Sequence, residues 1–205
     1  MPDSGAVIQP ARVTFPKCPR CWFPAPMIPL GALTFMCCRC EWPMTLTAPS
    51  VSTPAVPAST VTAANTTGTV VAVTISGGTL TYVYVNGSQA GTTAGTYLVP
   101  VAGTISVTYS VAPTWAWALP QTSASVSAGG TALPFAEGGT CYSYGQILIV
   151  DPSGTSDVVK VNGTPAGTSV PVNSLNSAHG SGVSVAVAVL SPELSGAEAV
   201  PQTSY

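Results

Sequence analysis

Four cysteines near the start of the chain have the spacing of a metal site. Cys18 and Cys21 form one Cys-x-x-Cys pair, and Cys37 and Cys40 form a second, with residues 22–36 between them. Two residues between thiolates allow a tight turn to direct both sulfurs at one ion, and two such turns complete a tetrahedron. Four sulfur ligands favour Zn²⁺. The spacing therefore predicts a structural zinc site with no coordination position left for water, which counts against Lewis-acid catalysis.

Two alternatives to this assignment stay open. Cys38 lies beside Cys37 and could displace Cys37 or Cys40 as a ligand, although the spacing favours Cys37 and Cys40. The same sulfurs could also hold iron in a rubredoxin-like electron-transfer site, but no other feature of the sequence indicates a redox partner. We therefore expect zinc bound by the two regularly spaced pairs.

Around these cysteines, residues 16–42 resemble a zinc ribbon. Pro19 follows the first thiolate, and aromatic residues flank both pairs, as in the knuckles and hairpins of ribbons: Trp22, Phe23, Phe35 and Trp42. The resemblance implies a small domain over residues 1–45 that depends on its ion, because so short a segment cannot build a sufficient apolar core.

Zinc ribbons often bind nucleic acid, and this part of the protein holds four of its five basic residues: Arg12, Lys17, Arg20 and Arg39. Against Asp3 and Glu41, these residues leave a small positive balance. Four thiolates on a divalent cation carry a net negative charge that cancels this balance. We therefore expect a ribbon that docks to protein, with nucleic-acid binding as the alternative.

The whole sequence is poor in charge and rich in residues that interrupt helices. Only 6% of its 205 residues are Asp, Glu, Lys or Arg, 46% are hydrophobic, and Gly and Pro occur 20 times each. This composition excludes a helical bundle, a coiled coil and a charge-rich disordered tail. A single His counts against a typical metabolic enzyme. A surface with so few charges is unusual for a free soluble protein, so we expect its faces to be covered largely by partners.

A strand-and-turn pattern occurs twice after residue 68. The segment Val83–Thr92, VYVNGSQAGT, matches Val159–Thr168, VKVNGTPAGT, and the alternating strands before and after it match in the same order. Asn86-Gly87 predicts a tight hairpin, because both residues tolerate positive φ. The pattern predicts two copies of one β module, over residues 69–111 and 145–190.

The predicted fold class is all-β: a small N-terminal zinc ribbon followed by two repeated Ig-like β-sandwich modules on extended Pro/Ser/Thr-rich linkers. In sequence order we expect a ribbon (1–45), a linker (46–68), module 1 (69–111), a Trp-containing connector (112–144), module 2 (145–190) and a C-terminal tail (191–205). Trp115 and Trp117 in the connector are expected to close module 1 or to fasten the connector; a sugar-binding groove is the alternative.

Other reactive residues give weaker signals. Cys141 and His179 could form a nucleophile pair, but the sequence places no obvious acid to orient the imidazole, so we expect Cys141 to be a small buried apolar group. Asp151 and Asp157 flank a Pro-Ser-Gly segment and are expected to serve the turn. We therefore predict no catalytic residues.

The start of the sequence has no pattern of a secretory signal peptide, and no apolar run is long enough to cross a bilayer. We therefore expect a protein made and kept in the cytoplasm, where thiols stay reduced. Repeated Thr/Val/Gly-rich modules on Pro-rich linkers resemble surface proteins, which are normally exported. The Ala/Pro/Gly/Thr bias, the segment Val85–Pro100 and the order of ribbon and repeats resemble virion proteins of bacteriophages, which assemble inside the host cell.

This resemblance implies a non-enzymatic virion component, a capsid decoration or minor capsid protein. Its expected partners are the major capsid protein or other virion subunits, together with further copies of itself in a symmetric assembly, and no membrane. The alternatives are a minor tail or tail-tip protein, a host-surface or carbohydrate-binding adhesin module, and a zinc-ribbon protein that binds nucleic acid.

Overall fold

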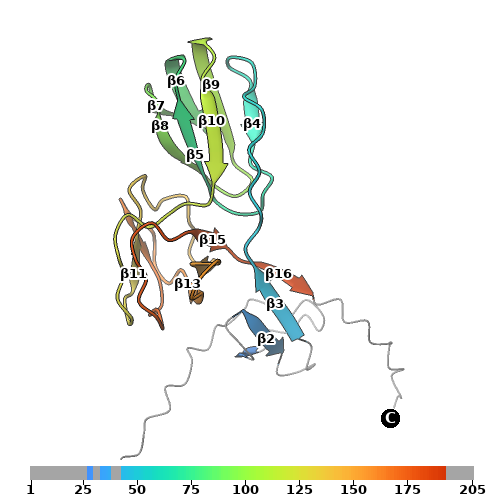
Figure 1. The fold of residues 1–205 in the computed structure, drawn as a ribbon, viewed down its shortest axis with the longest axis vertical. Helices are drawn as coiled ribbons and strands as arrows, with labels where there is room; N and C mark the ends of the chain where they lie inside the picture. Colours follow the sequence, from blue (N-terminus) through green and yellow to red (C-terminus); the bar gives the residue numbers. More distant parts are fainter. Residues whose placement is uncertain (1–26, 30–32, 38–42, 193–205) are drawn as a thin grey trace, which may run out of the picture.

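The structure, a computed structural model, describes residues 27–29, 33–37 and 43–192 (Figure 1). Within these residues all regular structure is β: sixteen strands form several small antiparallel sheets, and no helix is present. None of the described segments is therefore a helix able to cross a membrane. The all-β class predicted from the sequence is confirmed.

Seven strands form a sandwich of two sheets, at the top of Figure 1. One sheet has the order β10 (Thr114–Ala118), β5 (Val71–Ser76), β8 (Gly95–Val99), and the other has the order β4 (Thr62–Ala64), β9 (Thr104–Val111), β6 (Thr79–Val85), β7 (Ser88–Gly91). We call these strands the first sandwich. Except for the β6–β7 hairpin, consecutive strands lie in opposite sheets.

The interior of the first sandwich follows from the alternation seen in the sequence. Five of its strands, β5, β6, β8, β9 and β10, contribute apolar side chains from one face to a single buried cluster: Val71, Val73, Ile75, Val83, Val99, Ile105, Val107, Trp115 and Trp117. Because successive side chains of a strand point to opposite faces, the residues between them face outwards or towards a neighbouring unit. The predicted hairpin at Asn86-Gly87 is confirmed: it joins β6 to β7, with φ of 51° and 76°.

A second unit follows the sandwich in the sequence. Its central strand β12 (Ile147–Val150) pairs with β13 (Asp157–Lys160) and β15 (Val185–Val187), and β11 (Ala132–Pro134) pairs with β14 (Ser169–Pro171). All four residues of β12 are buried. Their burial explains the continuous apolar run Ile-Leu-Ile-Val, which alternation would not have produced.

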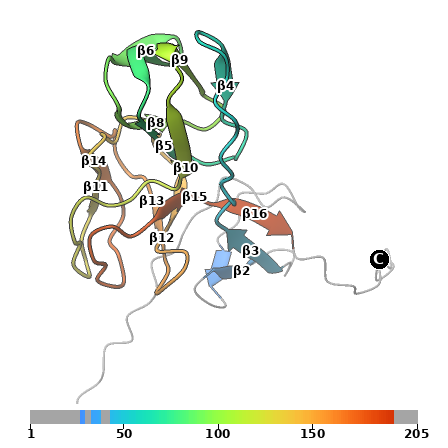
Figure 2. The ribbon, with the colours of Figure 1, turned by 45° about the horizontal axis from the view of Figure 1, so that its top comes forward.

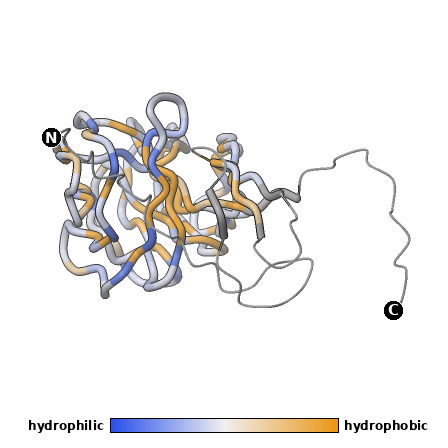
Figure 3. The backbone as a smooth tube through the Cα atoms, turned by 90° about the horizontal axis from the view of Figure 1, so that it is seen from below, coloured by the Kyte–Doolittle hydropathy of each residue, from blue (hydrophilic) through white to orange (hydrophobic). Residues whose placement is uncertain are grey.

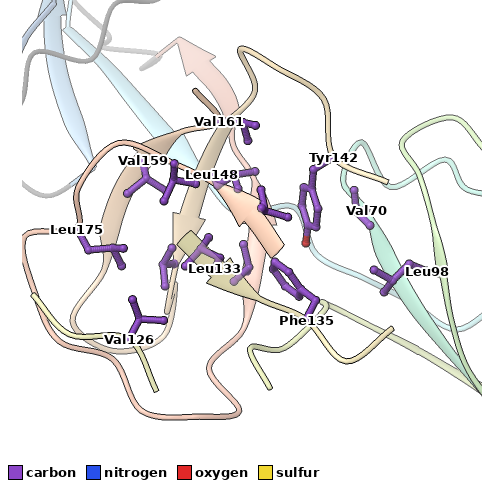
Figure 4. Close-up of a cluster of buried hydrophobic side chains, with 14 of the residues drawn as sticks. Val70, Leu98, Val126, Leu133, Phe135, Tyr142, Leu148, Val159, Val161 and Leu175 are labelled. Atoms are coloured by element: carbon purple, nitrogen blue, oxygen red, sulfur yellow. The ribbon is translucent and has the colours of Figure 1, made fainter. Parts of the chain in front are cut away.

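The first sandwich and the second unit share a core (Figure 4). Val70, Ala72 and Leu98 belong to the sandwich, yet they pack in the same buried cluster as Phe135 and Tyr142 of the second unit. The start of β5 is therefore buried on both faces, because Val71 and Val73 point into the sandwich while Ala72 points out of it. Figure 3 shows hydrophobic segments concentrated in the interior of the protein.

A fifth sheet forms the base of the molecule. Its order is β1 (Met27–Pro29), β2 (Thr34–Cys37), β3 (Pro43–Thr47), β16 (Val189–Pro192). Strand β16 follows β15 almost directly and pairs with β3 (Figure 2). The last described strand therefore lies in the same sheet as the first three. Phe35 and Leu46 are buried in this sheet.

The two copies of the sequence repeat differ in their strand pairing. In the first copy β5 and β6 lie in opposite sheets, whereas β12 and β13, which match them in sequence, pair directly with each other. Gly77 and Gly78, with φ of 64° and 69°, carry the backbone from β5 into the opposite sheet. The equivalent positions in the second copy, Ser153 and Gly154, do not adopt positive φ. One sequence pattern is thus used in two sheet arrangements.

The described strands also extend beyond the ranges predicted for the modules. β4 lies in the range predicted as linker (46–68), and β10 and β11 lie in the range predicted as connector (112–144). Residues ahead of β4 are fastened along the first sandwich: Trp115 Nε1 donates to Pro54 O at 2.8 Å, and Tyr109 Oη donates to Pro57 O at 2.8 Å. Hydrogen bonds to backbone carbonyls cannot be predicted from Pro/Ser/Thr composition.

Candidate functional site

The predicted zinc ligands are only partly within the described residues. Cys18, Cys21 and Cys40 lie outside them, and of Cys37 the structure gives the backbone position, at the end of β2. No group of three or more His, Cys, Asp or Glu that could hold a metal occurs in the described part of the protein. The zinc site therefore stays a prediction.

Two short strands of the segment between the cysteine pairs are described. β1 and β2 form an antiparallel hairpin in which Met27 is opposite Cys37. The hairpin folds the spacer between the pairs back on itself, so that Cys37 lies level with the residue at which β1 begins. A zinc ribbon requires such a return, because both pairs must reach one ion.

His179 and Asp157 form a buried pair that the sequence analysis missed. His179 Nε2 lies 3.0 Å from Asp157 Oδ2, and the two residues are 5% and 3% exposed. Asp157 Oδ2 also accepts a hydrogen bond from Ser177 N at 2.8 Å, and the backbone of His179 pairs with Val126 in an isolated bridge. The sequence indicated no obvious acid to orient His179, and the structure supplies one in Asp157. The prediction that Asp157 serves a turn is wrong.

This pair joins three separate parts of the second unit. Asp157 begins β13, His179 lies in the loop before β15, and Val126 lies before β11. The residues come together only in the folded protein, so the spacing of one His and one Asp carried no signal. Because the imidazole is enclosed and bonded to the carboxylate, the arrangement stabilises the loop; a substrate would have no access to it.

Cys141 occupies a different environment from His179. Its Sγ donates to Leu98 O at 3.5 Å, and the residue packs against the shared core. Burial raises the pKa of the Cys141 thiol, which keeps it protonated and lowers its reactivity as a nucleophile. The thiol and the imidazole thus have separate partners, which supports the interpretation of Cys141 as a packing residue.

A cleft of ≈370 Å³ lies where the first sandwich meets the loop that contains Cys141. Hydroxyl and amide side chains line much of it, and Glu137 supplies its only charge; the lining residues are Val85, Ser88, Gln89, Ala90, Thr96, Tyr97, Leu98, Glu137, Thr140 and Cys141. These groups can form hydrogen bonds with a ligand. With the Cys141 thiol held protonated, they provide no activated nucleophile.

Close to this cleft, Tyr142 packs on Phe135 with ring centroids 5.1 Å apart. Its hydroxyl is buried and has no hydrogen-bond partner among the described residues. Burial, and to a smaller degree the nearby Cys141 and Glu137, raises the pKa of the Tyr142 phenol far above its ordinary value. Tyr142 is therefore a neutral aromatic core residue.

The tryptophans of the predicted connector are core residues of the first sandwich. Trp115 and Trp117 lie on β10, are 8% and 6% exposed, and pack against each other with ring centroids 5.7 Å apart. Their alternation with Thr114, Ala116 and Ala118 directs both rings inwards. The alternative of a sugar groove built on these two rings is wrong, because their faces are covered.

Two other aromatic residues remain on the outside. Tyr82 and Tyr84 lie on the outer face of β6 with ring centroids 5.9 Å apart, and Tyr82 is 39% exposed. Opposite them are Thr108 and Ser106 of β9. This face, which we call the tyrosine face, combines two aromatic rings with hydroxyl groups and contains no Asp, Glu, Lys, Arg or His.

Indeed, residues 42–136 contain no Asp, Glu, Lys, Arg or His. The first sandwich therefore contains no Asp, Glu, Lys, Arg or His side chain. The charged residues of the second unit are Glu137, Asp151, Asp157 and Lys160. Charge is thus distributed very unevenly along the sequence.

No protein-family model, no curated protein and no solved structure matches the chain.

Proposed function

We propose that this chain is a non-enzymatic structural protein of a bacteriophage particle, a capsid decoration or minor capsid protein. In this proposal the cysteine-rich N-terminal segment docks to the major capsid protein or to other virion subunits. The first sandwich and the second unit then extend from the docked end. The protein assembles in the host cytoplasm, as a symmetric set of copies.

The observation that carries the proposal is the base sheet. β3, which follows the cysteine pairs, is paired with β16, which ends the described residues, at Thr47↔Val189 and Leu46↔Leu190. Both ends of the described β region are therefore held in one sheet, and the first sandwich lies away from it (Figures 1 and 2). Such an arrangement suits a protein that is attached at one end and exposes the other.

The lack of charge in the first sandwich supports a role in contact with other subunits. Burying an unpaired charge in an interface costs free energy, whereas hydroxyl and apolar groups can be covered at lower cost. Large apolar side chains are exposed on this sandwich and its flanking segments: Val61 (51%), Val101 (37%) and Val111 (59%). These residues provide apolar contact area without a charge to desolvate.

Zinc would act in this proposal as a cross-link of the docking segment. Cys18, Cys21, Cys37 and Cys40 would hold the ion, and four thiolates leave no position for a reactive water. The N-terminal segment would then keep one shape, which reduces the entropy lost when it docks. The chemistry of the donor set supports this role, as does the β1–β2 hairpin that folds back the segment between the two pairs.

The proposal is tested on particles purified from infected cells. We expect many copies of the protein on the head, in a fixed ratio to the major capsid protein, by gel densitometry and by electron microscopy of a tagged protein. A few copies at the tail would instead support a minor tail protein. Absence of the protein from particles overturns the proposal.

The docking role of the metal is tested with the variant Cys21→Ser, with Cys141→Ser as the matched control. We expect Cys21→Ser to lower the zinc content of the purified protein and to prevent incorporation into particles, while Cys141→Ser leaves both unchanged. Normal incorporation of a zinc-free Cys21→Ser protein would separate docking from the metal and would contradict this part of the proposal.

The tyrosine face favours a second candidate function, binding of a neutral surface glycan of the host. Aromatic rings can pack against the apolar faces of sugars, while nearby hydroxyls donate and accept hydrogen bonds. The substitutions Tyr82→Ala and Tyr84→Ala should then abolish retention on immobilised cell-wall polysaccharide, with Tyr144→Ala as an exposed tyrosine control. Equal retention of all variants would rule out this candidate.

A further inference from the structure

We propose that Asn162 is a site of spontaneous deamidation, and that the equivalent residue of the first copy, Asn86, is protected from the same reaction. Both residues lie in the tripeptide Val-Asn-Gly, at Val85–Gly87 and Val161–Gly163. The covalent neighbours that set the intrinsic reactivity are therefore the same on both sides. The folded structure, however, holds the two asparagines differently.

The reaction needs water and no protein cofactor. The backbone nitrogen of the following glycine loses its proton to base and attacks Cγ of the asparagine. A new bond joins this nitrogen to Cγ, the bond between Cγ and Nδ2 breaks, and ammonia leaves. Water then adds to either carbonyl of the five-membered imide and opens it to aspartate or isoaspartate. Glycine is the most permissive following residue, because it has no side chain to obstruct the ring closure.

Asn162 meets the conditions for this attack. It is exposed, its φ is not in the left-handed region, and its backbone nitrogen donates to Pro171 O at 3.1 Å. Neither its side-chain amide nor the backbone N–H of Gly163 forms a hydrogen bond with any other described residue. The attacking nitrogen and the side-chain amide are thus both free of competing hydrogen bonds among the described residues.

Asn86 is held by two hydrogen bonds with one residue of the neighbouring strand. Its backbone nitrogen donates to Thr104 O at 2.9 Å, and its Oδ1 accepts from Thr104 N at 2.8 Å. Gly103 also lies close, since a Cβ added there would be 2.9 Å from Asn86 Oδ1. The Asn86 amide must break its bond to Thr104 before Cγ can reach the Gly87 nitrogen, and the positive φ of both turn residues fixes the backbone as well.

Deamidation of Asn162 would change the charge of a surface that has few charged residues. Deamidation of Asn162 adds one negative charge to a protein with a formal net charge of −2. The new carboxylate appears two residues from Lys160, the only Lys or Arg of the second unit. Aged protein would therefore differ from fresh protein in the electrostatics of one face of the second unit, while the first sandwich stays uncharged.

The positions of the basic residues make the test direct. Trypsin cleaves after Lys160 and after Arg39, which puts Asn86 on the fragment 40–160 and Asn162 on the fragment 161–205. The folded protein is incubated at mildly alkaline pH, then denatured and digested, and the mass gain of about 1 Da per event is followed on each fragment. Fragmentation of the peptides assigns the gain to Asn162, Asn173 or Asn176.

In the folded protein we expect the fragment 161–205 to gain mass at Asn162 roughly tenfold faster than the fragment 40–160 gains it at Asn86, as for a conformational barrier of about 1.4 kcal/mol. Isoelectric focusing should show a new acidic form with the same time course. The variant Asn162→Gln, which would have to close a larger ring, should abolish this form.

Incubation in concentrated urea is the matched control, because the unfolded protein loses the Thr104 bonds. There the two Val-Asn-Gly sites should react at similar rates. Equal rates in the folded protein, or faster reaction at Asn86, would overturn the proposal. A rate difference that persists unchanged in urea would also overturn it, because the difference would then come from the sequence.

Discussion

The first sandwich and the second unit are alike in sequence but differ in how they are held together. The sandwich has no Asp, Glu, Lys, Arg or His and relies on alternating apolar strands with two buried tryptophans. The second unit has shorter strands, longer loops, and a buried His179–Asp157 pair that ties one of those loops. The sandwich uses neutral side-chain hydrogen bonds, such as that from Trp115 Nε1 to Pro54 O, to fasten the segment ahead of β4. In the second unit, a carboxylate–imidazole pair fixes a loop instead.

The two regions nevertheless are not independent. Val70, Ala72 and Leu98 of the sandwich complete the core of the second unit, so the end of the β5–β8 outer face that carries them is interior. We expect the described β region to unfold as one cooperative body. The following experiments test that expectation and the difference between the two regions, from the largest expected effect to the smallest.

The largest effect is expected for Phe135→Ala in the shared core. Phe135 is fully buried and packs on Tyr142, so its truncation removes a large apolar group and leaves a cavity. We expect the free energy of unfolding to fall by about 3–5 kcal/mol in urea titrations. The control Tyr142→Phe removes only a hydroxyl that has no partner among the described residues, and should be close to neutral. A change below about 1 kcal/mol for Phe135→Ala would contradict the packing.

Leu98→Ala tests the contact between the two regions. Leu98 is 6% exposed, and its loss should lower the free energy of unfolding by about 2–3 kcal/mol. Because this residue lies in the contact, we also expect the single transition to separate into two when fluorescence and circular dichroism are compared. The control is Leu80→Ala, since Leu80 packs against the core of the sandwich and not in the contact. This substitution should lower the stability of the sandwich without separating the transitions. One unchanged transition for Leu98→Ala would show that the contact is not what couples the regions.

Asp157→Ala tests the polar link of the second unit. The substitution leaves His179 Nε2 and Ser177 N without their acceptor, at an expected cost of about 2 kcal/mol. Part of this cost comes from the loss of the His179–Asp157 pair. In a His179→Ala background that part should be absent, as a double-mutant cycle can measure. Asp151→Asn, at a turn with φ of 55°, is the matched control and should change the stability little. Additive effects of Asp157→Ala and His179→Ala would refute the coupling.

The smallest effect concerns the pH dependence contributed by Cys141. Its thiol pKa is raised in the folded protein, so this contribution to stability is complete below the ordinary thiol pKa of 9.0 and is lost as the pH rises through the folded value. Urea midpoints measured from pH 7 upwards should therefore fall above pH 9 more steeply for the natural protein than for Cys141→Ala. Parallel curves for the two proteins would contradict a thiol pKa raised by partial burial.

Particular residues show how much the sequence could predict. The alternation of Val71, Val73 and Ile75 and the Asn86-Gly87 turn predicted β5, β6 and the β6–β7 hairpin correctly, since both signals are local. The pairing of β3 with β16 could not be predicted, because it joins residues that lie near opposite ends of the described sequence. The predicted zinc ligands rest on spacing alone, and three of the four lie outside the described residues.

The sequence by itself determined the all-β class, the position of most strands in the first sandwich, and the absence of charge over residues 42–136. Tertiary structure alone decided that β5 and β6 lie in opposite sheets while β12 and β13 pair, that Trp115 and Trp117 are enclosed, and that Asp157 meets His179. The physical reason is that alternation and turn propensity depend on residues close in the sequence. Sheet partners and buried polar pairs depend instead on the packing of segments that are distant in the sequence.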